Sequence, residues 1–165
     1  GALSNRMASG WRFTVALTSV LMISGIIVTS SYYHDMLLYG GTMSWTDAFY
    51  PAIASVRSAF PTELCILEWG FFDNSRLFTQ GKIELSAAND PTLNEDERRF
   101  SKAQIMKPGA LFITHTKGNE SEPGRTEHVL SYAAELGYQK SNLRTFTDSN
   151  GRPIIEVFSL TPRRQ

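Results

Sequence analysis

The feature that most limits what this chain can fold into is an uncharged stretch near its amino end. Between Phe13 and Tyr33 the sequence contains no Asp, Glu, Lys or Arg, and aliphatic residues dominate. A helix needs about 20 apolar residues to span a bilayer. The stretch reaches that length, although Ser and Thr residues dilute its hydropathy. We therefore predict a membrane-spanning helix here. The alternatives are a buried helix or strand pair of a soluble domain, or a secretory signal, which lacks a clear cleavage site.

The residues on either side of this stretch predict its orientation. Arg6 and Arg12 precede it, and no Lys or Arg follows closely. Because positively charged residues favour the cytoplasmic side, the amino end is expected in the cytoplasm and the remainder on the extracytoplasmic (periplasmic) side. Trp11, Tyr32 and Tyr33 would then act as anchors at the two interfaces.

Composition divides the chain into four segments. We expect a tag or flexible tail in residues 1–10, the apolar segment in 11–39, one α/β soluble domain in 40–160 and a short tail in 161–165. Net charge is zero and no basic stripe is present, which argues against a nucleic-acid partner. The single cysteine, Cys65, excludes an internal disulfide and a cysteine zinc cluster, and we interpret it as a core residue.

Residues 45–160 alternate between helical and extended patterns. Ser44 and Asp47 resemble a capping box before the first helix, and Asn150-Gly151 indicates a closing hairpin. This alternation predicts a three-layer Rossmann-like sandwich with a mainly parallel sheet and a C-terminal antiparallel hairpin. The expected elements are helix Trp45–Ala59, strand Leu64–Leu67, helix Phe71–Phe78, strand Lys82–Ala87, helix Thr92–Met106, strand Ala110–Thr114, helix Gly124–Gly137, and hairpin strands Leu143–Thr147 and Ile154–Leu160.

Polar residues follow two of the expected buried strands. Ligands of open α/β sheets usually bind where strands end and helices begin. We therefore predict a ligand-binding edge at these two strand ends. Its candidate residues are Glu68, Trp69, Asp73, Asn74, His115 and Glu120.

Several chemistries lack their motifs. Bulky aromatics follow Gly70 where a dinucleotide site needs further glycines, and no Gly-x-Ser-x-Gly elbow is present. The three histidines have no metal-ligand spacing. We therefore predict no cofactor and no metal. Glu68 and Asp73, with Glu120 and Glu122 nearby, leave acid–base chemistry by paired carboxylates open.

Each candidate also has a structural interpretation. Glu68 would cap the helix that begins near Phe71. His115 would make ordinary hydrogen bonds in a loop. Trp69, Phe71 and Phe72 would fill the core instead of stacking on a sugar or lipid. The charged run in Thr92–Met106 would be a solvated helix face.

Four segments together resemble a known family. They are Gly40–Tyr50 (GGTMSWTDAFY), Glu68–Phe71 (EWGF), Phe112–Glu120 (FITHTKGNE) and Asp148–Phe158 (DSNGRPIIEVF). With the apolar segment before them, they resemble the carboxyl-terminal part of polytopic bacterial membrane glycosyltransferases, relatives of the protein mannosyltransferases and the lipid A aminoarabinose transferases. The likeness covers roughly residues 11–160.

The resemblance implies a parent enzyme that transfers sugar from a polyprenyl-phosphate donor. It implies an upstream membrane domain of the same polypeptide as partner, and a lipid-linked sugar or acceptor glycan as ligand. The family's catalytic acidic residues belong to a loop with no counterpart here, so catalytic residues stay unassigned.

Three hypotheses follow from these observations. The first is an extracytoplasmic accessory domain that recognises acceptor or covers the active site. The second is a stand-alone small-molecule enzyme, which predicts a deep closed pocket with a perturbed carboxylate or histidine. The third is a non-catalytic interaction module, which predicts an apolar patch and no pocket.

Overall fold

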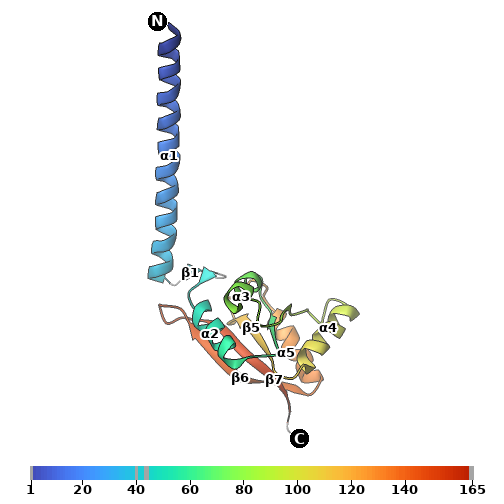
Figure 1. Cartoon of the computed structure of the whole chain (residues 1–165). Helices are drawn as coiled ribbons and strands as arrows, with labels where there is room; N and C mark the ends of the chain where they lie inside the picture. The colour runs from blue at the N-terminus through green and yellow to red at the C-terminus, as the bar shows by residue number, and fades with distance from the viewer. Residues whose placement is uncertain (1, 40, 43–44, 164–165) are drawn as a thin grey trace.

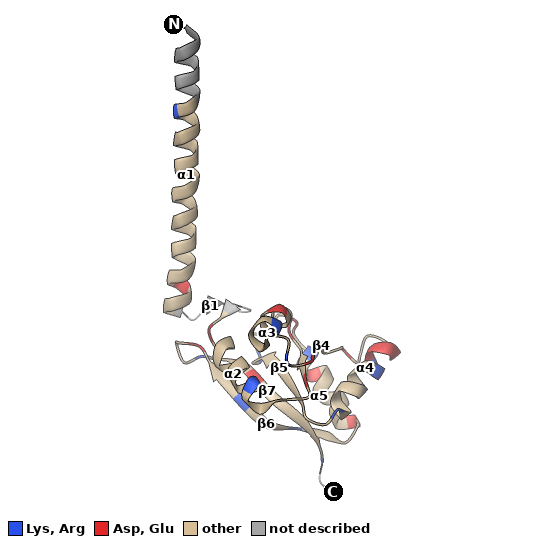
Figure 2. Cartoon of the chain, viewed as in Figure 1, with Lys and Arg blue, Asp and Glu red and all other residues tan. Residues whose placement is uncertain are grey.

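The computed structural model describes residues 2–39, 41–42 and 45–163. Its first element is a single long helix, α1 (Ala2–Tyr39), which extends away from the rest of the chain (Figure 1). Within it, Trp11–Leu38 is long and apolar enough to cross a membrane, and none of its most apolar window is buried. Figure 2 shows no charged residue between Arg12 and Asp35. The alternative of a helix buried in a soluble core is therefore wrong, because these side chains are not buried by any other part of the chain that the structure describes.

A short connection joins α1 to the α/β domain. Strands β1 (Gly41–Thr42) and β2 (Trp45–Thr46) pair antiparallel, and helix α2 (Phe49–Ala59) follows. The predicted start at Trp45 is wrong, because that residue pairs in β2. Ala48, at the start of α2, makes no side-chain cap bond. The predicted partner in a capping box, Ser44, lies outside the described residues.

The sheet has five strands in the order β4-β3-β5-β7-β6. Strand β3 pairs parallel with β4 and with β5, while β7 pairs antiparallel with β5 and with β6. The fold class α/β is confirmed, but the sheet is mixed and not mainly parallel. The long hairpin supplies this difference, because β7 inserts directly beside β5. The strands are β3 (Glu63–Ile66), β4 (Leu85–Ala87), β5 (Ala110–His115), β6 (Tyr138–Thr147) and β7 (Pro153–Pro162).

Helices pack on both faces of this sheet. One buried cluster joins α2 and α3 (Phe71–Thr79) to side chains such as Leu64, Ile66 and Ile113. The other joins α4 (Glu95–Met106) and α5 (Arg125–Glu135) to Cys65, Leu67 and Phe112. Successive residues of β3 thus enter opposite clusters, as the alternation of strand side chains requires. Every residue of β3 is buried because both faces are covered.

Several predicted boundaries shift. The strand predicted over Lys82–Ala87 shortens to β4 (Leu85–Ala87), since only these residues pair with β3 at the edge of the sheet. The charged helix begins at Glu95, where the Asn94 side chain accepts a hydrogen bond from Glu97 N at 2.9 Å. The hairpin strands are longer than predicted, because β6 continues back to Tyr138 across a bulge.

Two structural interpretations are confirmed. Cys65 is fully buried, and burial raises the pKa of its thiol to about 12, so it is a core residue. The charged side chains of α4 mostly face water, and its pair Arg98–Glu135 is exposed at both ends. Exposed pairs of this kind contribute about 0–1 kcal/mol each.

Candidate functional site: a cleft at the carboxyl ends of β3 and β5

The two polar loops predicted to form a site meet at one edge of the sheet. Strands β3 and β5 are parallel neighbours, with Ile66 opposite Ile113. Just beyond β3, Leu67 N donates to Ile113 O at 3.0 Å. The chain therefore leaves both strands at the same edge. The first helix after β3 packs on one face and the helix before β5 on the other, and this reversal is where crevices form in such sheets.

Glu68 is the central residue of this edge. It is only 3% exposed, and its Oε2 accepts hydrogen bonds from Ser121 N at 3.0 Å and from the Ser121 hydroxyl. Its Oε1 is buried and has no hydrogen-bond partner among the described residues. The interpretation of Glu68 as a helix cap is wrong: its Oε2 bonds to Ser121, its Oε1 accepts no hydrogen bond from a described residue, and Gly70 holds the N-cap position of α3 with φ 92°. Glu68 instead ties the end of β3 to the loop before α5.

The environment of Glu68 favours its ionised form. Burial by itself raises the pKa of a carboxyl. The contacts with His115 and with the hydroxyl and amide of Ser121 outweigh burial, and the pKa of Glu68 lies below its usual value. The site therefore holds a negative charge whose second oxygen has no partner in the described part of the chain, an arrangement that is costly unless a donor reaches it.

His115 lies behind Glu68. It ends β5, is 1% exposed, and its ring centroid is 4.5 Å from that of Phe71. Its Nδ1 is 3.5 Å from Glu68 Oε2, the outer limit of hydrogen-bond length. Neither ring nitrogen meets hydrogen-bond geometry with any described residue, so we treat the Glu68 contact as electrostatic. The interpretation as an ordinary loop histidine is therefore wrong, because the strand extends to this residue and buries it.

A cleft of about 380 Å³ opens beside Glu68. Four of the six predicted site residues line it, whereas His115 and Glu120 do not. Arg125 at the start of α5 was missed, although its position just after a turn next to a strand-end loop could have indicated it. The lining residues are Ile66, Glu68, Trp69, Gly70, Phe72, Asp73, Asn74, Ala87, Glu122 and Arg125.

The three aromatic residues of this junction have different environments. Phe71 is 1% exposed and packs in the core, as its structural interpretation predicted. Trp69 is 73% exposed and Phe72 is 37% exposed, so for these two residues that interpretation is wrong. Gly70, with φ 92°, separates exposed Trp69 from buried Phe71. The cleft is therefore lined in part by an indole that is exposed to solvent and not packed in the hydrophobic core.

Most of the charged side chains that line the cleft are acidic. Glu68, Asp73 and Glu122 contribute carboxylates, and the single guanidinium, Arg125, is paired with Glu122. Glu120 does not line the cleft, but it interacts electrostatically with Glu68. Burial, Glu127 and Glu68 raise the pKa of Glu120. Within the described residues, no three His, Cys, Asp or Glu side chains form a group that could hold a metal ion.

A second cavity, of about 650 Å³, lies between the end of α2 and the loop after α3. Arg57, Phe60 and Lys82 are among its lining residues. None of the buried unpartnered polar atoms of the described chain belongs to its lining. We therefore place the candidate site at the smaller cleft, where Glu68 Oε1 lacks a partner.

No protein-family model matches this chain, and no curated protein matches it significantly.

Proposed function

We propose that this chain is the last membrane helix and the extracytoplasmic accessory domain of a membrane glycosyltransferase. The parent enzyme would use a polyprenyl-phosphate sugar donor, and the upstream membrane domain of the same polypeptide would hold the chemistry. The α/β domain would recognise the sugar of the donor or acceptor and cover the active site. The observation that carries this proposal is the cleft with exposed Trp69 beside a buried, ionised and half-unpartnered Glu68.

The cleft has the chemistry of a sugar site. A pyranose offers apolar C–H faces and a ring of hydroxyl donors. The exposed indole of Trp69 can stack on the C–H face of the sugar. Glu68 Oε1 and the carboxylate of Asp73 can accept hydrogen bonds from its hydroxyls. A volume of about 380 Å³ is in the range of small-molecule sites. These features support recognition of one or two sugar units.

The charged side chains of the cleft further limit the class of ligand that it can bind. Three carboxylates face one guanidinium that is already paired, so the local field is negative. A phosphate or pyrophosphate would be repelled by this field. The cleft therefore suits the sugar of a lipid-linked donor, or an acceptor glycan, and not the phosphate of the carrier.

The proposal is tested by titrating the ¹⁵N-labelled full chain in detergent with water-soluble methyl glycosides of common pentoses and hexoses. At least one glycoside is expected to shift resonances of Trp69, Asn74 and Ser121. The Trp69→Ala variant should bind it at least tenfold more weakly. Leu77→Ala is the matched control, because Leu77 is 71% exposed on the same helix as Phe72 but does not line the cleft. Absence of cleft shifts with every glycoside would refute sugar recognition.

A second candidate is a stand-alone small-molecule enzyme. One observation favours it: His115 is buried directly behind Glu68, and the pKa of this Glu68 carboxyl, which lines the cleft, is perturbed, as is typical of active sites. The titration samples themselves distinguish the two functions. Conversion of a glycoside over hours, lost in Glu68→Gln and His115→Gln, would favour the enzyme. The presence of the cleft argues against the third hypothesis, a module without a pocket.

A further inference from the structure

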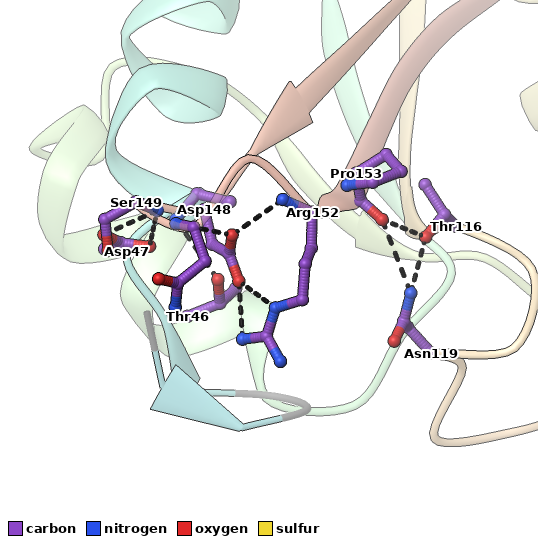
Figure 3. A network of polar contacts seen from close by, with 10 residues as sticks. Thr46, Asp47, Thr116, Asn119, Asp148, Ser149, Arg152 and Pro153 are labelled. Atoms are coloured by element: carbon purple, nitrogen blue, oxygen red, sulfur yellow. Dashed lines mark hydrogen bonds and ion pairs between the residues drawn. The ribbon is translucent and has the colours of Figure 1, made fainter. Parts of the chain in front are cut away.

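The β6–β7 turn lies at the same edge of the sheet as the cleft. His115, the last residue of β5, pairs with Ile155 near the start of β7. Beyond β5, Thr116 Oγ and Asn119 Nδ2 donate to Pro153 O at 2.7 and 3.4 Å (Figure 3). The loop that bonds to Pro153 continues directly to Ser121, which holds Glu68. The turn and the cleft loop are therefore tied together.

The same turn is bound to the segment that emerges from α1. Ser149 N donates to both carboxylate oxygens of Asp47 at 3.2 Å (Figure 3). Buried Asp148 closes the turn by accepting from the backbone amides of Asn150 and Arg152 and pairing with the Arg152 guanidinium. Asp47 is eight residues beyond Tyr39, the end of α1. Even a fully extended chain of that length reaches only about 28 Å.

A row of aromatic rings makes a second, independent connection. Phe49 is the first residue of α2, and its ring centroid lies 5.6 Å from that of Phe71, the first residue of α3. Phe71 in turn lies 4.5 Å from His115. The segment after the anchor thus contacts the residues immediately behind the cleft. Figure 1 shows the same arrangement, with α3 and the start of α2 on the side of the α/β domain nearest α1.

From these contacts we infer that the edge of the sheet that carries the cleft is the membrane-facing side of the α/β domain. The cleft takes a hydroxyl-rich headgroup carried by a lipid, not a solute from bulk water. The 28-residue span Trp11–Leu38 is about 42 Å long as a helix, close to the full thickness of a bilayer with its headgroups. The connection to Asp47 therefore starts near the headgroup layer. Trp69, exposed at the cleft, is of a residue type that favours that layer.

Orientation is tested with single-tryptophan reporters in the full chain. The chain is reconstituted in phosphatidylcholine vesicles, some with a nitroxide on the choline headgroup. One reporter retains Trp69 in a Trp11→Phe, Trp45→Phe background. The matched reporter carries Trp69→Phe and Phe60→Trp in the same background. Phe60 follows the last turn of α2, just before the opposite end of β3, and is 85% exposed. Acrylamide quenching in detergent and thermal unfolding confirm that both reporters are exposed and folded.

Nitroxide lipid should quench Trp69 at least threefold more strongly than the Phe60→Trp reporter. Equal quenching, stronger quenching of the Phe60→Trp reporter, or failure of the chain to float with vesicles would each overturn the membrane-facing orientation. This arm does not depend on whether the cleft binds sugar.

The lipid-borne ligand rests on the proposed function and has its own arm. A methyl glycoside that binds in detergent is compared with the dodecyl glycoside of the same sugar in vesicles. The vesicle-borne dodecyl glycoside should occupy the site at a total concentration at least tenfold lower than the methyl glycoside needs. Equal concentrations would overturn the lipid-borne ligand while the proposed sugar recognition stands. If neither glycoside binds, both the lipid-borne ligand and the proposed sugar recognition are refuted. The membrane-facing orientation is then decided by the quenching experiment alone.

Discussion

At the scale of single residues, Glu68 links the core to the cleft. Its Oε2 binds Ser121 and contacts His115, while its Oε1 lacks a partner among the described residues. Hydrogen bonds to a buried charge contribute about 1.5–3 kcal/mol each, and the same charge left half-satisfied is costly. Glu68 therefore stabilises the loop before α5, while its second oxygen makes no hydrogen bond to any described residue.

The first prediction concerns the pH dependence of stability. Because the folded-state pKa of Glu68 lies below the usual value of 4.5, its stabilisation is complete above about pH 4.5 and decreases as pH falls through the folded-state pKa. Glu68→Gln should lower the free energy of unfolding at pH 7 by about 1.5–3 kcal/mol. That deficit should shrink at pH 3.5. Urea unfolding of the full chain in mild detergent measures both values.

Glu135→Gln serves as the control for this prediction. Glu135 is 59% exposed in its pair with Arg98, so its replacement should cost less than about 1 kcal/mol at either pH. A Glu68→Gln deficit that stays constant from pH 7 to 3.5 would show that the charge of Glu68 does not stabilise the fold.

At the scale of elements, helix α2 ends with a strained residue. Phe60 has φ 46° and ψ 55°, a left-handed conformation that costs a residue with a Cβ about 1–2 kcal/mol. Its side chain is 85% exposed and gains little from packing. Glycine is the usual residue at this position of a helix end.

Phe60→Gly should therefore raise the free energy of unfolding by about 0.5–1 kcal/mol, because the relief of strain exceeds the backbone entropy cost of glycine. Urea unfolding measures the change. Gly109→Ala should do the opposite: Gly109 has φ 76°, and a Cβ there would lie 3.3 Å from Thr62 Cγ2. A loss of stability in Phe60→Gly would mean that the phenyl ring packs usefully in the nearby cavity.

At the scale of the whole molecule, α1 and the α/β domain differ in what surrounds their apolar side chains. The side chains of Trp11–Leu38 are almost all exposed, whereas the domain buries apolar clusters on both faces of its sheet. An exposed apolar helix of this length needs a bilayer or another helix around it. The hydrogen bonds from Ser149 to Asp47 tie the segment after α1 to the β6–β7 turn of the domain.

The full chain is accordingly expected to stay in the membrane fraction after alkaline carbonate extraction. Replacing Ile23 and Ile26 by Asp should release it, because each central carboxylate costs about 2.5–3.5 kcal/mol of insertion free energy. Leu143→Asp is the control: Leu143 is 50% exposed on β6, so its replacement should leave the chain in the membrane fraction. Extraction of the unmodified chain by carbonate would contradict membrane insertion.

Much of the fold and part of the candidate site were predictable from local patterns. The apolar run of β3, the break at Gly70 and the Asn150-Gly151 turn each act over a few residues, and they predicted a strand, a helix start and a hairpin that the structure confirms. The start of α2 was wrong because pairing of Trp45 with Thr42 overrides helix propensity. Arg125 was missed because its place in the cleft depends on how α5 packs on the sheet.

By itself the sequence determined the apolar helix, the α/β class and the polar character of two strand ends, because composition, periodicity and turn residues are local. Only the tertiary structure decided that β7 lies beside β5, which makes the sheet mixed. It also decided that Glu68 bonds to Ser121, 53 residues away, and not to its own helix. Contacts between distant segments depend on which faces pack together, and no local pattern specifies that choice.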